Sequence, residues 1–285
     1  MTPNSINLAD NLDFLRNIED GSVNLIYIDP PFNTGATQSM TSLKTVRDDE
    51  GDRIGFGGNR YRTERGESKS YLDSFDDYIG FLMSRMEEAK RVLAPNGSLF
   101  LHVDQRESHY CKVLLDQVFG RGSFMNEIIW SYDYGGRSKR KWPAKHDTIF
   151  WYAVDPKNYT FNADNIDRIP YMAPSLVGKE KAARGKIPTD VWWQTIVPTN
   201  GKERTGYPTQ KPIAILDRIV KVHSNAGELV MDFFAGSGTT GVAAAKNDRR
   251  FVLVDANNEA VQIAAKRLNE YDPECVGFIR ESQTV

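Results

Sequence analysis

The sequence predicts an α/β fold in which helices cover both faces of a mostly parallel sheet. Short apolar runs of strand length recur along the chain, among them residues 23–28, 98–103 and 228–231. The segments between them carry apolar residues at helical spacing, most clearly over residues 76–93. This alternation favours a parallel sheet, because parallel neighbours need long crossover connections, which helices supply.

Each expected element has a local signal of its own. Apolar side chains such as Tyr78 and Leu82 define one face of the helix over residues 76–93, and a Pro-Asn-Gly turn at 95–97 ends it before the next strand. No internal repeat interrupts the order of elements. The remaining expected elements are a helix at 107–119, a strand at 126–131, a helix at 213–222, a strand at 228–231, a helix at 239–247, a strand at 251–254 and a helix at 259–269.

Two stretches depart from the alternation. Residues 33–70 are polar and Gly-rich with little periodicity, and we expect a mobile loop there, because so long a loop in a compact domain is either functional or disordered. Residues 155–204 combine Pro-, Asn- and Lys-containing segments with the pair Trp192-Trp193, and we interpret them as a small insertion. The expected main domain therefore consists of residues 1–154 and 205–285.

Composition and charge exclude several classes of protein. The chain has 285 residues, a net charge of -2 and two cysteines, which argues against a disulfide framework and for a reducing cytoplasm. No apolar stretch approaches the ~20 residues of a membrane span, and the N-terminus lacks the pattern of a signal peptide. We therefore expect a cytoplasmic protein without a membrane partner. Because the spacing of zinc ligands is also absent, we expect no metal site.

Positive charge is concentrated between residues 137 and 145, where five of nine residues are basic. The pI of about 6.1 excludes a uniformly basic surface, so contact with a nucleic acid requires a local patch of this kind. Such a run is compatible with a solvated face, but it also offers contacts to phosphates. The candidate residues are Arg137, Lys139, Arg140, Lys141 and Lys145.

The tetrapeptide at 29–32 follows directly on the apolar run 23–28, where a buried strand gives way to a loop. Two consecutive prolines fix φ and remove two N–H donors, which leaves their carbonyls available to a ligand. A carboxylate on one side and an aromatic ring on the other complete a stiff pocket that only accepts hydrogen bonds. Asp29, Pro30, Pro31 and Phe32 therefore predict a site for a flat ligand with an NH2 group, such as adenine or cytosine.

A second candidate site is the Gly-rich turn at 232–241, which follows one expected strand and opens a helix. Its G-x-G-x-x-G pattern lets the backbone approach a ligand at a helix N-terminus. Asp255 ends the following strand, where a carboxylate can accept hydrogen bonds from both ribose hydroxyls. This unit predicts an adenosine-bearing cofactor without separating NAD from S-adenosylmethionine.

The tetrapeptide at 29–32 favours S-adenosylmethionine over NAD. A hydride-transfer enzyme has no evident use for this motif, whereas methyl transfer to an exocyclic amine does. An exocyclic amine is a poor nucleophile, since its lone pair is delocalised into the ring. A carboxylate at Asp29 and a carbonyl at Pro30 that accept its N–H bonds would localise this lone pair and stabilise the transition state more than the ground state. Phe32 would stack on the flipped base, which contributes about 1–3 kcal/mol in single-strand binders.

These two motifs resemble those of amino-directed DNA methyltransferases. The tetrapeptide at 29–32 is similar to their catalytic motif, and residues 232–238 are similar to their S-adenosylmethionine motif. Because the catalytic motif comes first, the chain resembles the beta class, which has a circularly permuted Rossmann-like methyltransferase fold. Asp255 departs from the family, which often has Glu there. The resemblance implies cofactor contacts by Asp10, Asn11, Thr209, Lys211, Asp232, Phe233, Phe234, Gly236, Gly238, Thr239 and Asp255.

The resemblance implies methylation of N6 of adenine in double-stranded DNA. N4 of cytosine is the alternative, and Asp29 favours adenine because cytosine-N4 enzymes more often have Ser at this position. We rank below these an RNA or protein-amide methyltransferase and a catalytically silent DNA-binding module. The insertion at 155–204 would read the DNA sequence, and residues 33–70 would close over the target. A homodimer and a cognate restriction nuclease remain open.

Three residues outside these motifs receive a structural interpretation. Cys111 falls in a helical pattern and is expected in the core, and neither cysteine follows a proline, so cytosine-C5 methylation has no candidate nucleophile. His102 and Asp104 lie at the end of an expected strand. Their position could assist chemistry, but we interpret them as a structural pair.

Overall fold

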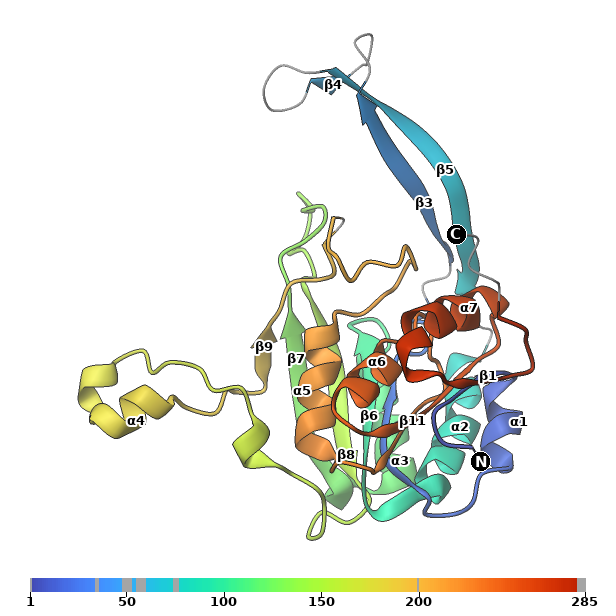
Figure 1. Cartoon of the computed structure of the whole chain (residues 1–285). Helices are drawn as coiled ribbons and strands as arrows, with labels where there is room; N and C mark the ends of the chain where they lie inside the picture. Colours follow the sequence, from blue (N-terminus) through green and yellow to red (C-terminus); the bar gives the residue numbers. More distant parts are fainter. Residues whose placement is uncertain are drawn as a thin grey trace.

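A nine-stranded sheet forms the centre of the fold in this computed structural model, which describes residues 2–33, 36–47, 53–54, 60–73, 77–198 and 200–280 (Figure 1). Its strand order is β12-β1-β11-β10-β2-β6-β8-β7-β9, and β8 alone runs antiparallel to its neighbours. The mostly parallel sheet predicted from the sequence is thus confirmed. The strands are β1 (Ser5–Leu8), β2 (Val23–Ile28), β6 (Leu93–Asp104), β7 (Phe124–Ser131), β8 (His146–Ala153), β9 (Val191–Trp193), β10 (Leu229–Asp232), β11 (Arg250–Asp255) and β12 (Glu274–Val276).

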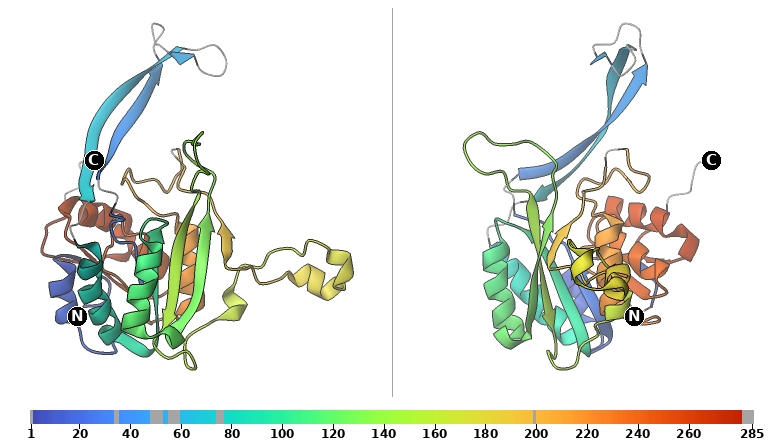
Figure 2. Two further views of the ribbon diagram at one scale, coloured as in Figure 1. Left: turned by 180° about the vertical axis from the view of Figure 1, so that it is seen from behind. Right: turned by 90° about the vertical axis from the view of Figure 1, so that its left-hand side faces the viewer.

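Helices cover both faces of the sheet, as expected (Figure 2). Successive residues of β2 point to opposite faces. Ile26 and Ile28 therefore join the apolar cluster under α1, α2 and α3, whereas Leu25 and Tyr27 join the cluster under α5, α6 and α7. The helices are α1 (Asn11–Arg16), α2 (Tyr78–Val92), α3 (Ser108–Phe119), α5 (Ile213–His223), α6 (Thr239–Lys246) and α7 (Asn258–Arg267).

The boundaries of the expected elements agree with the structure within a few residues, with one informative exception. The turn expected at 95–97 lies inside β6, which starts directly after α2. The register between β2 and β6 shifts there, from Val23 opposite Leu93 to Leu25 opposite Ser98. A bulge thus absorbs the extra residues, and bulges are among the few sheet positions where proline is tolerated. Cys111 is fully buried, as expected.

The loop expected at 33–70 is wrong where the structure describes it. β3 (Ala36–Arg47) and β5 (Arg60–Asp73) pair as a long antiparallel hairpin, with β4 (Arg53–Ile54) added beside β5. The hairpin rises from the edge of the main sheet where the strand before it ends (Figure 1). A ladder of backbone hydrogen bonds can form without an apolar periodicity in the sequence. This explains why the sequence pattern did not predict these strands. The rest of the stretch lies outside the described residues.

The insertion at 155–204 returns into the main sheet. Its last element, β9, pairs in parallel with β7, and Trp192 lies opposite Trp130. Trp192 is 9% exposed, whereas Trp193 is 73% exposed. The helix α4 (Lys179–Arg184) lies far out to one side of the sheet (Figure 1). Within the described ranges, the chain has no helix of the length and apolarity that a membrane span requires.

The contrast between the two tryptophans tests this placement of β9. We expect Trp192→Ala to lower the free energy of unfolding by about 3–5 kcal/mol, because a buried aromatic side chain leaves a cavity. Trp193→Ala is the matched control and should change it by less than about 0.5 kcal/mol. Urea denaturation of both variants measures the difference, and equal losses would contradict the burial of Trp192.

Candidate active site

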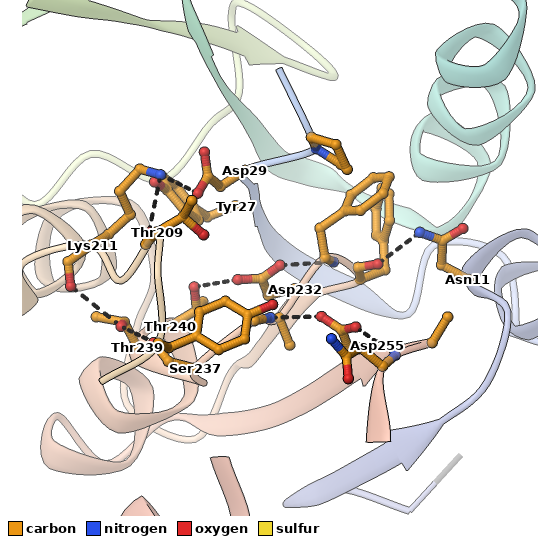
Figure 3. Close-up of a pocket in the computed structure, with 18 of the residues that line it drawn as sticks. Asn11, Tyr27, Asp29, Thr209, Lys211, Asp232, Ser237, Thr239, Thr240 and Asp255 are labelled. Carbon is orange, nitrogen blue, oxygen red and sulfur yellow. Dashed lines mark hydrogen bonds and ion pairs between the residues drawn. The ribbon is translucent and has the colours of Figure 1, made fainter. Parts of the chain in front are cut away.

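A cavity of about 400 Å³ opens at the carboxyl edge of the main sheet (Figure 3). β10 pairs in parallel with β2, with Met231 opposite Ile26. The two predicted motifs therefore leave the sheet side by side. Pro30, Phe32 and Gly238 are not among the residues that line the cavity. The other predicted catalytic and cofactor residues line it, namely Asp10, Asn11, Asp29, Pro31, Thr209, Lys211, Asp232, Phe233, Phe234, Gly236, Thr239 and Asp255.

The Gly-rich turn has the backbone conformation that its glycines predict. Gly236 and Gly238 have φ of 49° and 75°, which disfavours other residues. A Cβ at Gly238 would lie 2.7 Å from that of Ala264. The backbone amide of Gly236 donates to Oδ2 of Asp255 and that of Asn257 donates to Oδ1, both at 2.8 Å. Since a carboxylate oxygen accepts two hydrogen bonds, Asp255 keeps acceptor capacity for a diol.

Asp232 is buried beneath this turn and holds its shape. Its carboxylate accepts hydrogen bonds from the Thr240 hydroxyl at 2.6 Å and from the Phe234 amide at 3.0 Å. Burial, which disfavours the charge, raises the pKa of Asp232 to about 7. Burial also raises the pKa of Asp255. The cofactor side of the cavity thus contains carboxyl groups whose ionisation is suppressed.

Two of the predicted cofactor contacts, Asp10 and Asn11, also have structural partners. The amide of Asn11 donates to the carbonyl of Phe233 at 2.9 Å, and its oxygen accepts from Arg85 at 2.6 Å. Asp10 caps α1 by accepting from two backbone amides. Both side chains line the cavity. Their contacts with a cofactor therefore stay a prediction, while their role in tying α1 to the Gly-rich turn is visible.

Lys211, one of the predicted cofactor residues, also contacts the catalytic motif. Its ammonium group forms an ion pair with Asp29 (Figure 3). The side chains of Asp29 and Lys211 are 15% and 11% exposed. The Lys211 ammonium also lies 5.1 Å from the ring centroid of Phe32. Its carbonyl accepts a hydrogen bond from Thr239 at 3.3 Å, so this segment links the catalytic motif to α6.

The interpretation of His102 and Asp104 as a pair is wrong. Asp104 pairs with Arg106, whereas His102 contacts the Tyr27 hydroxyl at 2.7 Å and Asp147 at 3.2 Å. Sequence reasoning missed this network, because Tyr27 belongs to an apolar run and Asp147 to a strand that we did not predict. The pair His146-Asp147 at the start of that strand was the available signal.

The predicted phosphate contacts lie on the loop 132–145 between β7 and β8. Arg137 pairs with Asp133 at 2.5 Å, and Lys145 donates to carbonyls of the same loop. The loop and the β3–β5 hairpin rise from the same edge of the sheet (Figure 2). Lys139, Arg140 and Lys141 are exposed there.

Comparison with known proteins agrees with this geometry. A family model described as DNA methylase matches residues 23–266. The chain belongs to this family. It is 31% identical to the type II methyltransferase M.HpaI of Haemophilus parainfluenzae over 93% of this chain and 73% of the relative. It is 28% identical to the DNA adenine methyltransferase YhdJ of Escherichia coli strain K12, over 97% and 87% of the two chains.

A solved structure has the same fold. The cytosine-N4-specific PvuII DNA methyltransferase superposes with a TM-score of 0.63 at 14% identity, over 97% of this chain and 95% of its own. The family uses S-adenosylmethionine, and the cavity fits this cofactor. Its volume is that of a small-molecule site. The glycines of the Gly-rich turn have no Cβ, so the backbone there can lie close to a ligand. Asp255 offers hydrogen-bond acceptors for a ribose.

The raised pKa of Asp232 makes stability depend on pH. A carboxyl group with a raised folded-state pKa stabilises the fold below its unfolded pKa and loses this contribution as pH rises to about 7. We expect the wild type to lose up to about 1.4 kcal/mol per pH unit between about pH 4 and 7 relative to Asp232→Asn. Urea denaturation without cofactor at several pH values measures this difference, and parallel pH profiles would contradict it.

Proposed function

We propose that this enzyme transfers a methyl group from S-adenosylmethionine to N6 of an adenine flipped out of duplex DNA. The placement of Asp29 beside the cofactor cavity carries the proposal, because its carboxylate can accept a hydrogen bond from an amino group there. The bound cofactor supplies an electrophilic methyl group. Lys211 already forms an ion pair with Asp29. The charged groups of the site are therefore preorganised before the base binds.

Phe32 supports a base-binding role for the same loop. Its ring lies 5.9 Å from that of His102 and within cation–π distance of Lys211. A flipped base that stacks on Phe32 would place its amino group next to Asp29 and the carbonyl of Pro30. The attacking lone pair would then be oriented toward the cofactor cavity.

N4 of cytosine is the second candidate target, since its amino group has the same geometry and the fold is shared with a cytosine-N4 enzyme. Adenine is favoured by Asp29 and by the similarity to an adenine methyltransferase. Mass spectrometry of nucleosides from DNA methylated by the purified chain distinguishes the two bases. Detection of N4-methylcytosine would overturn the adenine assignment.

Duplex DNA would lie over the carboxyl edge of the sheet. The loop 132–145 offers phosphate contacts there, and the β3–β5 hairpin rises beside it (Figure 2). We propose that the hairpin closes over the target and that the insertion reads the DNA sequence. The similarity to type II methyltransferases supports a cognate restriction nuclease as a partner.

Replacement of the catalytic carboxylate should separate chemistry from cofactor binding. We expect Asp29→Ala to lower the single-turnover rate of methyl transfer by about 10²–10³-fold, by analogy with the loss of one oxyanion-hole contact. Calorimetry should give an unchanged Kd for S-adenosylmethionine. Asp13→Ala, which removes an exposed carboxylate on α1, is the control. Wild-type turnover in Asp29→Ala would sink the mechanism.

The role of the loop 132–145 can be tested by the salt dependence of DNA binding. Removal of two phosphate contacts in Lys139→Ala/Lys141→Ala should reduce the slope of log Kobs against log salt concentration by about 1.8. The control is Lys246→Ala/Lys266→Ala, which removes exposed lysines at the C-terminal ends of α6 and α7. Equal slopes in wild type and the loop variant would place the DNA elsewhere.

A further inference from the structure

The Asp29 carboxylate has one oxygen that faces the protein interior. Oδ2 pairs with Lys211. Oδ1 is buried and has no hydrogen-bond partner among the described residues. It lies 4.0 Å from Nδ1 of His102. Because a buried acceptor without a partner is unfavourable, it points to a function.

The contacts of His102 define its tautomer. Although burial opposes the charge of Asp147, its hydrogen bond with His102 holds the pKa of this carboxyl below the ordinary value. An ionised carboxylate only accepts hydrogen bonds, so Nε2 of His102 must carry the hydrogen. In the neutral imidazole Nδ1 is then the unprotonated nitrogen, and it accepts from the Tyr27 hydroxyl. The basic nitrogen of His102 therefore faces Asp29.

The formal charges around His102 can be counted with its imidazole neutral and protonated. With neutral His102, the cluster of Lys211, Asp29, His102 and Asp147 has one positive and two negative formal charges, hence a net charge of −1. Protonation of His102 brings this to zero. The side chain of His102 is 0% exposed and that of Asp147 is 10% exposed. His102 can therefore accept a proton without leaving a net charge in this poorly solvated site, where a net charge is unfavourable.

The other groups that face His102 do not change this balance. Burial raises the pKa of Tyr27 and of Tyr132, so both hydroxyls stay neutral. Asp104 is paired with Arg106. Trp130 contacts the imidazole edge-on at 5.4 Å, and the Phe32 ring lies 5.9 Å from it, both measured between ring centroids.

We propose that His102 receives, through Asp29, the proton that the target amino group loses on methylation. This inference rests on the proposed function and adds the fate of the proton. The amine lone pair forms the N–C bond, and the methyl–sulfur bond breaks with its electron pair left on sulfur. The nitrogen now has a surplus proton, which passes to the Asp29 carboxylate. The carboxyl group then turns so that the oxygen carrying the proton lies toward Nδ1 of His102, which accepts it.

This transfer restores the Asp29 carboxylate and leaves an imidazolium between Asp29 and Asp147. The hydroxyl of Tyr27 rotates and accepts from Nδ1–H instead of donating to it. A separation of 4.0 Å exceeds a hydrogen bond, so the Asp29 side chain must move toward His102 when the base arrives. Catalytic contacts commonly tighten in this way on substrate binding. The proton returns to solvent after the product leaves.

The tautomer can be measured without turnover. The chain has four histidines, so ¹⁵N-histidine labelling of the full chain gives few NMR signals, and their loss in His102→Asn assigns those of His102. We expect the neutral imidazole of His102 to be the Nε2–H tautomer. An Nδ1–H tautomer would overturn the proposal.

Single-turnover methyl transfer to duplex DNA between about pH 5.5 and 9 tests the proton path. We expect the wild-type rate to fall on acidification with the titration of His102 seen by NMR. His102→Asn should lower the rate by about 10²–10⁴-fold and remove this inflection, with cofactor Kd and Tm retained. Asp147→Asn should move the inflection to lower pH, because the imidazolium loses its counter-charge.

His223→Asn is the matched control, since His223, the last residue of α5, is also buried and contacts the rings of Phe100 and Trp151. It should keep the wild-type pH profile. A wild-type rate independent of pH, or an inflection retained in His102→Asn, would overturn the proposal. If His102→Asn does not fold, the shift in Asp147→Asn decides. A wild type that methylates no DNA would count against the proposed function, whereas the tautomer still tests His102 separately.

Discussion

The parallel pairing of β10 with β2 is the constraint on which the site depends. It places two motifs that are far apart in the chain at one edge of the sheet, because adjacent parallel strands end on the same side. Asp29 follows one strand and Asp232 ends the other. The Gly-rich turn can then hold a cofactor next to the loop that would hold the base. Everything else in the site serves to keep these two loops in register.

Carboxyl groups outnumber cationic side chains in the cavity, which gives it a preference among ligands. Four carboxyl groups line it against two cationic side chains, Arg85 and Lys211. A methyl donor with a sulfonium charge is attracted to such a site, and it loses this charge when the methyl group leaves. The carboxyl groups that attract the charged methyl donor therefore bind the demethylated cofactor less strongly. Suppressed ionisation of Asp232 keeps the excess charge small when the cavity is empty.

The sequence predicts the parts of the site that are local. The motif Asp29–Phe32 and the Gly-rich turn can be recognised in the sequence, because a strand, a turn and a helix N-terminus each require particular residue types over a few positions. The pairing of His102 with Asp147 depends instead on the antiparallel register of β6 and β8, which no local pattern encodes. The ion pair of Lys211 with Asp29 is equally long-range. The hairpin β3–β5 escaped detection because its strands lack an apolar alternation.

Lys211 gives the two halves of the site a physical connection. Its side chain holds the Asp29 carboxylate, while its backbone carbonyl accepts from the Thr239 hydroxyl at the start of α6. Thr239 and Lys211 both line the cavity, so a cofactor bound there would lie close to both. A shift of this segment on cofactor binding would alter the partner of Asp29 and hence the affinity for the base. Linkage makes such coupling reciprocal, so the base must change the affinity for the cofactor by the same factor.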